Sequence, residues 1–301
     1  MSRFLIACVC LSVVAGPLAI GYGRDREPLT VLVMDPLALP LSCPCVKGHA
    51  QRLYDKLGTY LENELGRPVK VLFSDDLGKV VRNETKNIDV IIGKQSVVVF
   101  DAKISDMAVR PAMMLTGKDG KTTLIGLIVV RKDDPAQKLE DLKGYTVLFG
   151  PPECDEKFQA AAEALQKAGV VLPAKFETRP GCSDSVVEML EHPEKPVASV
   201  ISSYAAALLE GCGTIEKGSI RIVGRTRPVP FVTVFYTDRM EKAAASRVSA
   251  ALASVKEHPD LAAFLETTLG FVPVEEASKT ADVKLGEKNI AEKSVESAKK
   301  N

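Results

Sequence analysis

The sequence predicts an α/β protein made of two lobes, and three observations lead to this prediction. Short β-branched runs alternate with amphipathic helices, this alternation starts again after residue 121, and two long extended segments separate the two series. Two α/β units joined by two extended crossovers imply a bilobed protein with mainly parallel sheets. The cleft between the lobes is the default ligand site of such a protein.

The first α/β unit contains three strands and two helices. LTVLVMD at 29–35 is typical of a strand buried on both faces, and a helix that ends at the Gly-Arg-Pro of 66–68 follows it. VKVLF at 69–73 and IDVIIG at 88–93 are the next strands, with a polar helical stretch at about 75–85 between them. The first helix has one continuous apolar face, formed by Ala50, Leu53, Tyr54, Leu57, Leu61 and Leu65.

The second unit begins with TTLIGLIVVRKDD at 122–134, which we interpret as one long strand, and YTVLFG at 145–150 is a buried strand. AKFETR at 174–179 is a strand, SDSVVEMLEH at 183–192 is a helix, and VASVISS at 197–203 is a strand before an Ala-rich helix. The helix after residue 150 places one apolar face at Phe158, Ala161, Ala162, Leu165 and Ala168.

The second extended segment is SIRIVGRTRPVPFVTVFYT at 219–237, and two helices at about 240–257 and 259–269 close the ordered chain. The chain should therefore cross between the lobes twice. We assign lobe 1 to residues 28–128 and 229–275, and lobe 2 to residues 129–228.

Both ends of the chain are expected to lie outside the two lobes. Residues 1–23 contain one basic residue, an uncharged apolar run and small residues at its end, which indicates a secretory signal peptide. A membrane anchor is disfavoured, because Gly16 and Pro17 interrupt the run and it is shorter than the roughly 20 residues a spanning helix needs. Residues 276–301 are polar and Lys-rich, which predicts a disordered tail. We expect an exported, periplasmic protein that is soluble after cleavage.

The composition and motifs argue against nucleic-acid binding and against catalysis. Lys plus Arg and Asp plus Glu both number 39, so no global positive field attracts nucleic acid. No G-x-S-x-G elbow or phosphate loop is present, and the three histidines, His49, His192 and His258, lie in different segments. No catalytic constellation is left, so we expect a binding protein and not an enzyme.

Polar side chains follow two predicted strands where ligands of α/β proteins bind, beyond the carboxyl ends. Ordinary loop polarity and helix capping are the alternative explanation for each residue alone. The candidate ligand-binding residues are Lys94, Gln95 and Ser96 after the strand at 88–93, and Ser202, Ser203 and Tyr204 after the strand at 197–203.

Four cysteines fall in loops that leave the carboxyl ends of strands, and we expect them to converge in the cleft. Cys43 and Cys45 lie on one lobe, and Cys154 and Cys182 lie on the other. Cysteine at a helix N-terminus, as at Cys154, tends toward the thiolate, although the acidic residues beside it oppose this. Cys212 follows a helix and should lie apart.

Two readings of these thiols stay open. With His49 they form a soft ligand set suited to copper or zinc, and no other cofactor is expected. In an exported chain, a disulfide between Cys154 and Cys182 is the alternative. A bridge between Cys43 and Cys45 would be a strained ring.

Four segments in order resemble the periplasmic solute-binding proteins of phosphate, phosphite and phosphonate ABC transporters, in the class of type II periplasmic binding proteins. The segments are YDKLGTYLENELGRPVKVLFSDD, IDVIIG, LIVVRKDDPAQKLEDLKGYTVLFGPPE and ALASVKEHPDLAAFLETTLGFVP. The resemblance runs from about Leu29 to Pro273, and its most specific part is the charged, turn-rich stretch that begins RKDDP. It implies a type II binding fold whose lobes close on a small phosphate-like or phosphonate-like ligand, with a membrane permease as partner.

The sequence departs from this family at the segment that holds the anion. Phosphonate binders typically present small hydroxyl residues and a glycine at a helix N-terminus after the strand equivalent to TVLFG, whereas this chain has PPECDEKF. Pro151 and Pro152 lack amides, and Glu153, Asp155 and Glu156 place three carboxylates there. We expect Glu156 to cap the helix and to point to solvent. Anion specificity therefore does not carry over.

Three functions remain as hypotheses. The leading one is an exported solute-binding protein that closes on a small ligand for an ABC transporter. The second is a thiol-based metal-binding or redox protein on the same scaffold, and the third is a sensing accessory that contacts a sensor and has no transport role.

Overall fold

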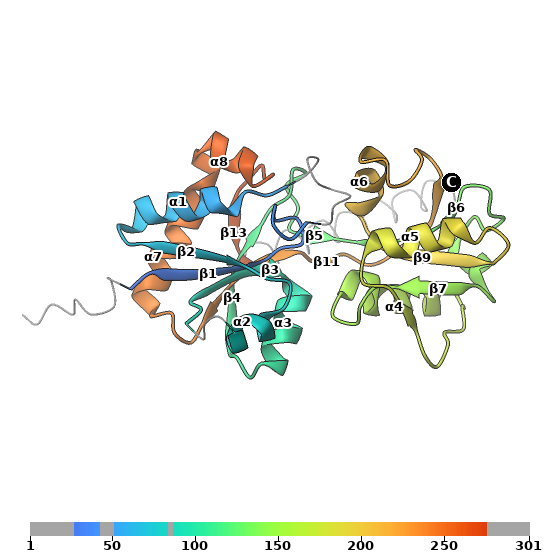
Figure 1. Cartoon of the computed structure of the whole chain (residues 1–301), viewed down its shortest axis with the longest axis horizontal. Helices are drawn as coiled ribbons and strands as arrows, with labels where there is room; N and C mark the ends of the chain where they lie inside the picture. The colour runs from blue at the N-terminus through green and yellow to red at the C-terminus, as the bar shows by residue number, and fades with distance from the viewer. Residues whose placement is uncertain (1–26, 43–50, 84–86, 276–301) are drawn as a thin grey trace, which may run out of the picture.

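The computed structural model describes residues 27–42, 51–83 and 87–275. In this structure two lobes lie side by side, each with its own β-sheet (Figure 1). The crossovers between them pair as a two-stranded ribbon of β5 (Thr123–Leu124) and β11 (Val229–Pro230). The predicted bilobed α/β fold with two crossovers is thus confirmed. The predicted signal peptide and tail, and the residues Cys43, Cys45 and His49, lie outside the described residues.

Lobe 1 contains a six-stranded sheet in the order β13-β4-β12-β3-β1-β2. β1 pairs in parallel with both β2 and β3, and β12, β4 and β13 complete the sheet with antiparallel pairing. The strands are β1 (Leu29–Met34), β2 (Val69–Phe73), β3 (Val90–Lys94), β4 (Val109–Leu115), β12 (Val232–Thr237) and β13 (Phe271–Pro273).

Helices cover both faces of the lobe 1 sheet (Figure 1). On one face Leu57, Leu61 and Leu252 pack into one apolar cluster, and on the other Leu77 and Val98 pack into a second. The helices are α1 (Tyr54–Leu65), α2 (Leu77–Asn83), α3 (Gln95–Ile104), α7 (Lys242–Ala253) and α8 (Pro259–Phe264), with a 3-10 turn at Ser254–Glu257. The predicted face of α1 is buried from Tyr54 to Leu65, but Leu53 precedes the helix. α3 and β4 were not predicted from the sequence.

Lobe 2 contains a five-stranded sheet in the order β10-β6-β9-β7-β8. The strands are β6 (Gly126–Arg131), β7 (Thr146–Phe149), β8 (Glu177–Thr178), β9 (Val197–Ser202) and β10 (Ile220–Arg225). Leu165 packs on one face of this sheet, and Met189 and Leu209 pack on the other. The helices are α4 (Gln159–Lys167), α5 (Cys182–Glu191) and α6 (Ala205–Gly211), with 3-10 turns at Leu139–Leu142 and Asp155–Lys157.

Both sheets are mixed, which corrects the expectation of mainly parallel sheets. The βαβ strands of each lobe pair in parallel, but β6 pairs antiparallel with β9, and β12 pairs antiparallel with β3. The reason is that β6 and β12 enter their sheets from the other lobe and so run in the opposite direction.

The predicted long strand at 122–134 and the predicted extended segment at 219–237 are each divided where the chain changes sheets. The first breaks at Ile125, between β5 and β6, and the second breaks between β10 and β11. Pro228 lies in that second break and has no amide for a ladder, which favours an interruption there. Residues 126–128, assigned to lobe 1 from the sequence, form part of β6 in the sheet of lobe 2.

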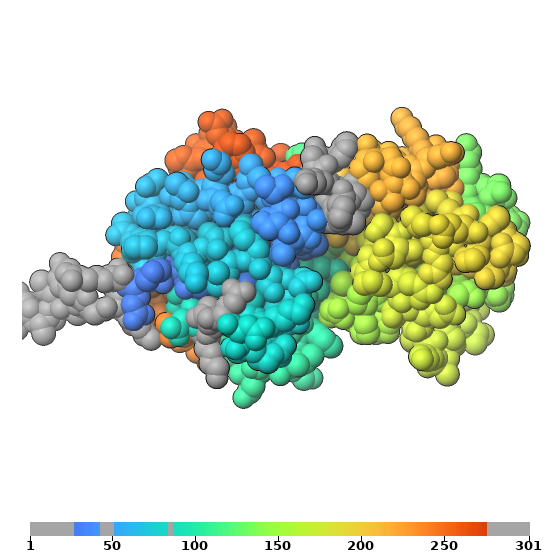
Figure 2. Space-filling view, in the orientation of Figure 1, coloured from blue at the N-terminus to red at the C-terminus, as the bar shows by residue number. Residues whose placement is uncertain are grey.

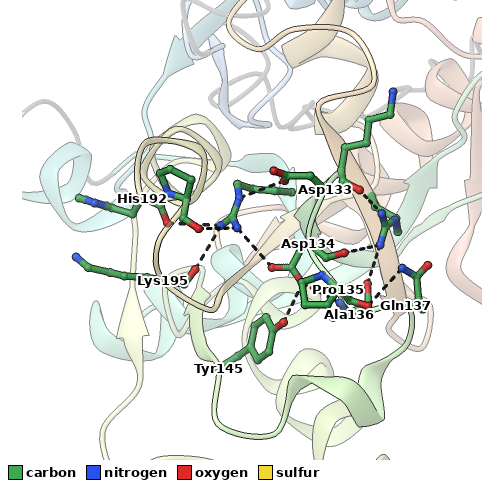
Figure 3. Close-up of polar contacts among 12 residues, drawn as sticks. Asp133, Asp134, Pro135, Ala136, Gln137, Tyr145, His192 and Lys195 are labelled. Carbon is green, nitrogen blue, oxygen red and sulfur yellow. Dashed lines mark hydrogen bonds and ion pairs between the residues drawn. The ribbon is translucent and has the colours of Figure 1, made fainter.

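The RKDDP stretch folds into a hydrogen-bonded turn after β6 (Figure 3). The buried Asp134 carboxylate accepts hydrogen bonds from the Tyr145 hydroxyl at 2.8 Å and from the Ala136 amide at 2.9 Å. Arg221 donates to the Asp134 carbonyl at 2.9 Å, and Arg131 donates to the Pro193 carbonyl at 2.8 Å. This network lies at the opposite end of β6 from Gly126, so it stabilises lobe 2 and does not reach the site described below.

Among the helices of the described residues, none is both long enough and apolar enough to span a membrane.

Candidate functional site

A cavity of about 400 Å³ lies between the lobes, and the lobes touch one another in the view of Figure 2. Lobe 1 contributes the loop after β1 and the end of β3, and lobe 2 contributes the segment after β7 and the first turns of α5 and α6. Much of the wall is apolar, formed by Met34, Leu37, Leu41, Val97, Leu208 and Leu209. A volume of this size is at the lower end of the range for small-molecule sites.

A buried ion pair crosses between the lobes at this cavity. Lys94 Nζ at the end of β3 lies 2.7 Å from Glu156 Oε1, and the two side chains are 4% and 0% exposed. The Ser202 hydroxyl at the end of β9 donates to the same oxygen at 2.6 Å. Burial would raise the pKa of Glu156, but Lys94 more than offsets this, so the pKa lies below its ordinary value and the group is a carboxylate at neutral pH.

The expectation that Glu156 points to solvent is therefore wrong. The Asp155–Lys157 turn packs directly against β6, because the carbonyl oxygen of Glu156 approaches to 2.0 Å from where a Cβ on Gly126 would lie. This close approach turns the Glu156 side chain inward, to Lys94. Its second oxygen, Oε2, is buried and has no hydrogen-bond partner among the described residues.

The next residue, Lys157, lines the cavity and is 6% exposed. Within the described part of the chain, its ammonium forms no ion pair or hydrogen bond. Burial lowers the pKa of Lys157, but Cys182, Cys154 and Glu156 nearby raise it to a net value of about 12. Lys157 is thus a buried cation at neutral pH, available to an anionic ligand.

A glycine permits the position of Lys157. A Cβ on Gly150 would lie 2.6 Å from Lys157 Cβ, closer than side-chain atoms pack. Only glycine at the end of β7 therefore lets the Lys157 stem lie against the strand.

Several backbone amides after β7 donate hydrogen bonds to carbonyl groups of the same turn, and so they do not face the cavity as free donors. Pro151 and Pro152 have none, Cys154 donates to the Pro151 carbonyl at 2.9 Å, and Lys157 donates to the Cys154 carbonyl at 2.9 Å. The amides of Cys154 and Lys157 are therefore already bonded within the turn. The first residues of α5, Cys182 and Ser183, also line the cavity, and the positive end of this helix dipole faces it.

Two of the predicted cysteines line the cavity, and both are free thiols. These are Cys154, in the segment after β7, and Cys182, the first residue of α5. Burial raises the pKa of Cys154 although Lys94 and Lys157 oppose it, so the expected tendency toward a thiolate is wrong. Cys182 Sγ lies 3.9 Å from the Ser202 hydroxyl.

The other thiol predictions depend on residues that are only partly described. Cys212 caps α6 and does not line the cavity, as expected. In residues 27–42, 51–83 and 87–275, no group of three or more His, Cys, Asp or Glu side chains is arranged to hold a metal ion. The placement of Cys43, Cys45 and His49 lies outside these ranges.

The six predicted ligand residues surround the cavity, but only two line it. Lys94 and Tyr204 are the two that line the cavity. The Tyr204 ring stacks on the ring of Phe231 in the crossover, with 5.7 Å between the ring centroids. Burial, followed by Cys182 and Glu156, raises the pKa of Tyr204 well above its ordinary value, so its hydroxyl stays protonated.

The remaining four predicted residues form hydrogen bonds with other parts of the protein and do not line the cavity. Gln95 Oε1 accepts from the Thr233 hydroxyl at 2.9 Å, and Ser203 Oγ accepts from the Ile125 amide at 3.5 Å. Ser96 Oγ accepts from the amide of Asp155 at 3.3 Å, which joins the two lobes. Ser202, as described, donates to Glu156.

Lys157, the unpaired cation of the cavity among the described residues, was not predicted from the sequence. It lies in the segment whose acidic residues were read as unfavourable to an anion. A signal was available, because Lys157 follows the carboxyl end of a buried strand, the same rule that selected Lys94.

Comparison with known proteins agrees with this architecture. Residues 47–281 match the family described as the periplasmic substrate-binding protein of phosphonate ABC transporters. No curated protein sequence matches the chain.

Three solved structures share the fold. A Xanthomonas citri protein bound to chloride ion has 18% identity and a TM-score of 0.62, and the match covers 88% of this chain and 98% of that one. A binding protein component of an ABC phosphonate transporter from Pseudomonas aeruginosa has 13% identity and a TM-score of 0.61, with 90% and 100% covered. PhnD1 from Prochlorococcus marinus in complex with methylphosphonate has 14% identity and a TM-score of 0.57, with 84% and 98% covered.

Proposed function

Because the chain belongs to the family of periplasmic substrate-binding proteins of phosphonate ABC transporters, we propose that it closes its two lobes on a small organic anion of the phosphonate class. It delivers this ligand to the membrane permease of a transporter and carries out no chemistry on it. The protein is exported by a signal peptide in residues 1–23 and acts in the periplasm.

The single observation that supports this proposal is that Lys157 is buried at the cavity without a partner among the described residues. A lysine that is 6% exposed loses most of its hydration, and it has no partner in the described residues to compensate. An anionic group in the cavity would supply that partner. The positive end of α5 at Cys182 adds to the attraction.

The shape and lining of the cavity support a small organic anion. The apolar wall formed by Met34, Leu37 and Leu208 suits a short carbon substituent, and the volume of about 400 Å³ does not accommodate a long one. Lys94 and Tyr204 come from different lobes, so ligand contacts on both sides would favour closure. A relative was solved with methylphosphonate, which is therefore the first probe.

Titration calorimetry with methylphosphonate tests the proposal, with Lys157→Met as the variant and Lys167→Met as its control. Lys167 is exposed at the end of α4, and methionine approximates the length of lysine. Loss of a charge-assisted contact should weaken binding about 10- to 100-fold in Lys157→Met. Binding should be unchanged in Lys167→Met, and ligand should make the native protein more compact in solution scattering. Equal affinity of both variants would refute the role of Lys157.

The second candidate function is a thiol-based metal or redox site, supported by the two free thiols in the same cavity. Cys154 and Cys182 would act with Cys43, Cys45 and His49, as a copper or zinc site or as a redox pair. The cations Lys94 and Lys157 beside the thiols disfavour a metal ion and favour the anion. Thiol counting with and without reductant, followed by metal analysis of protein from its native periplasm, tests this candidate. Normal methylphosphonate binding after all five mature cysteines are changed to serine would exclude it.

A sensing role is the remaining alternative, in which the closed protein contacts a sensor instead of a permease. Transport of methylphosphonate into cells with and without this protein separates the two roles, because only the transport role requires the protein for uptake.

A further inference from the structure

The buried charged groups at the cavity do not balance, because they are two lysines and one carboxylate. Lys94 from lobe 1 and Lys157 from lobe 2 line the cavity and are buried. Glu156 of lobe 2 does not line the cavity, but it is buried and paired with Lys94. Two carboxylates that solvent reaches also line the cavity, and water screens them: Asp75, whose side chain is 82% exposed, and the half-buried Glu153.

Glu156 neutralises one of the two buried cations. The distance of 2.7 Å from Lys94 Nζ to Glu156 Oε1 is that of a charge-assisted hydrogen bond, and Ser202 holds the same oxygen at 2.6 Å. Lys94 is therefore compensated by the protein itself, before any ligand enters. Lys157 is the uncompensated buried cation among the described residues.

Asp155 does not alter this balance. Its carboxylate pairs with Arg227 of lobe 2 at 3.2 Å and does not line the cavity. The buried groups thus present a ligand with one net positive charge, from Lys157, together with the partial charge at the start of α5.

We propose that Glu156 determines the charge of the ligand, so that the cavity prefers a monoanion to a dianion. This rests on the proposed function and assigns the specificity to one residue. A second negative charge on the ligand would lie between largely apolar walls, and the other cation, Lys94, is already paired. That charge would lose hydration without gaining a partner. Phosphonates that carry a single negative charge, such as monoesters, belong to the preferred class.

Methanesulfonate and sulfate are a suitable probe pair. Both are small tetrahedral sulfur oxyanions that do not titrate between about pH 5 and 8. One carries a single negative charge and a methyl group, and the other carries two negative charges. The ratio of their dissociation constants reports the charge preference, and the cost of closing the lobes cancels from it.

The wild-type protein should bind methanesulfonate more tightly than sulfate. Glu156→Gln keeps the size of the side chain and its hydrogen bonds but frees the charge of Lys94, so the ratio should move toward sulfate by about tenfold. Lys94→Gln should move it the opposite way, because Glu156 then repels both anions and the dianion more strongly. This second variant keeps the test valid if Glu156→Gln does not fold.

The double variant Lys94→Met/Glu156→Gln is the matched control. It removes the interlobe pair but restores the net charge of the wild-type cavity, so its ratio should return to the wild-type value. A double variant that behaves like Glu156→Gln would show that loss of the lobe contact, and not charge, sets the preference, and would overturn the inference. So would an unchanged ratio in Glu156→Gln, or a wild-type preference for sulfate.

The failure of the proposed function is a different result. If the wild-type protein binds none of methanesulfonate, sulfate and methylphosphonate, the cavity is not an anion site and both proposals are refuted. If it binds anions but the ratio does not follow the charge of residues 94 and 156, only the inference fails.

Discussion

Removing the hydroxyl of Tyr54 should destabilise the protein more than removing the hydroxyl of Tyr60 from the same helix. Both tyrosines lie on α1, six residues apart, and both hydroxyls form hydrogen bonds. Tyr54 donates to the buried Asp35 carboxylate at 2.7 Å, whereas Tyr60 lies 3.0 Å from the Ala251 carbonyl and 2.8 Å from the Ser254 hydroxyl. One acceptor is charged and buried, and the other partners are neutral and partly exposed.

The Asp35 carboxylate connects the first strand to the loop that forms the cavity wall. Arg52 donates to it at 2.8 Å, and the Leu37 amide donates to it at 2.9 Å. Arg52 also donates to the Leu265 carbonyl at 3.1 Å and lies over the Phe231 ring. Burial, with Asp35 next, raises the pKa of Tyr54 well above its ordinary value, so Tyr54 remains a donor across the usable pH range.

The size of the difference follows from the kind of hydrogen bond. A hydrogen bond to a charged group contributes about 1.5–3 kcal/mol to the free energy of unfolding, and a neutral one contributes about 0.5–1.5 kcal/mol. We expect Tyr54→Phe to cost about 2 kcal/mol and Tyr60→Phe to cost about 1 kcal/mol. In the melting temperature this is a decrease of about 4–8 °C against about 2–4 °C.

Differential scanning calorimetry of both variants measures the difference directly. Because Tyr54→Phe leaves Asp35 paired with Arg52, it should fold normally and keep its near-UV spectrum apart from one tyrosine. A melting temperature of Tyr54→Phe equal to or above that of Tyr60→Phe would refute the assignment of the Asp35 network as a main stabilising element of lobe 1.

The other predictions concern the contact between the lobes. Gly126→Ala should lower the free energy of unfolding by about 1–3 kcal/mol or more and weaken methylphosphonate binding, because the new Cβ would overlap the Glu156 carbonyl. Gly117→Ala is the control, because its new Cβ meets a side-chain oxygen at 3.1 Å and no backbone atom closer than 3.7 Å. In the same urea titration, its free energy of unfolding should stay within about 0.5 kcal/mol of the wild-type value. Acid should destabilise the wild type more than Glu156→Gln, because the pKa of Glu156 is lowered in the folded state. The stabilisation that the Glu156 carboxylate contributes is present above its unfolded pKa of about 4.3, and it is lost as the pH falls through the folded pKa. Urea midpoints measured from pH 6 down to about pH 3 should therefore converge, and parallel curves would contradict this pH dependence. Lys94→Met should cost about 3–5 kcal/mol in urea titration, because it leaves a buried carboxylate unpaired, and full recovery on adding Glu156→Leu would confirm that the unpaired charge is the cause.

Much of the fold could be predicted from local pattern. Hydrophobic periodicity of 3.6 identifies the buried face of α1 at Leu57, Leu61 and Leu65, and the β-branched run of β1 identifies a strand covered on both faces. These signals are local because the residues that form the buried face of a helix or strand recur at a fixed spacing along one short stretch of sequence. The alternation of such elements, repeated twice with two crossovers, was sufficient for the bilobed architecture.

Pairing direction and chain breaks were not local properties. The residues of β6 and β12 contain no signal of the lobe from which each strand enters its sheet. The antiparallel pairing of β6 with β9, and of β12 with β3, therefore becomes evident only in the folded structure. The interruption at Ile125 has the same origin, because the chain turns there to change sheets.

The candidate site shows the same division between sequence and structure. The rule that ligands bind beyond strand ends, applied to the sequence alone, selected eight of the described residues, and four of them line the cavity. Those that line it are Lys94, Tyr204, Cys154 and Cys182, and those that do not are Gln95, Ser96, Ser202 and Ser203. The orientation of Glu156 and Lys157 was decided only by tertiary structure. Gly126, which lies on β6, lets the Glu156 backbone approach that strand closely. Gly150, directly after β7, leaves room for the stem of Lys157. Charge in a sequence can be counted, but which charges cancel depends on distances of a few ångströms between lobes, and these exist only after the chain has folded.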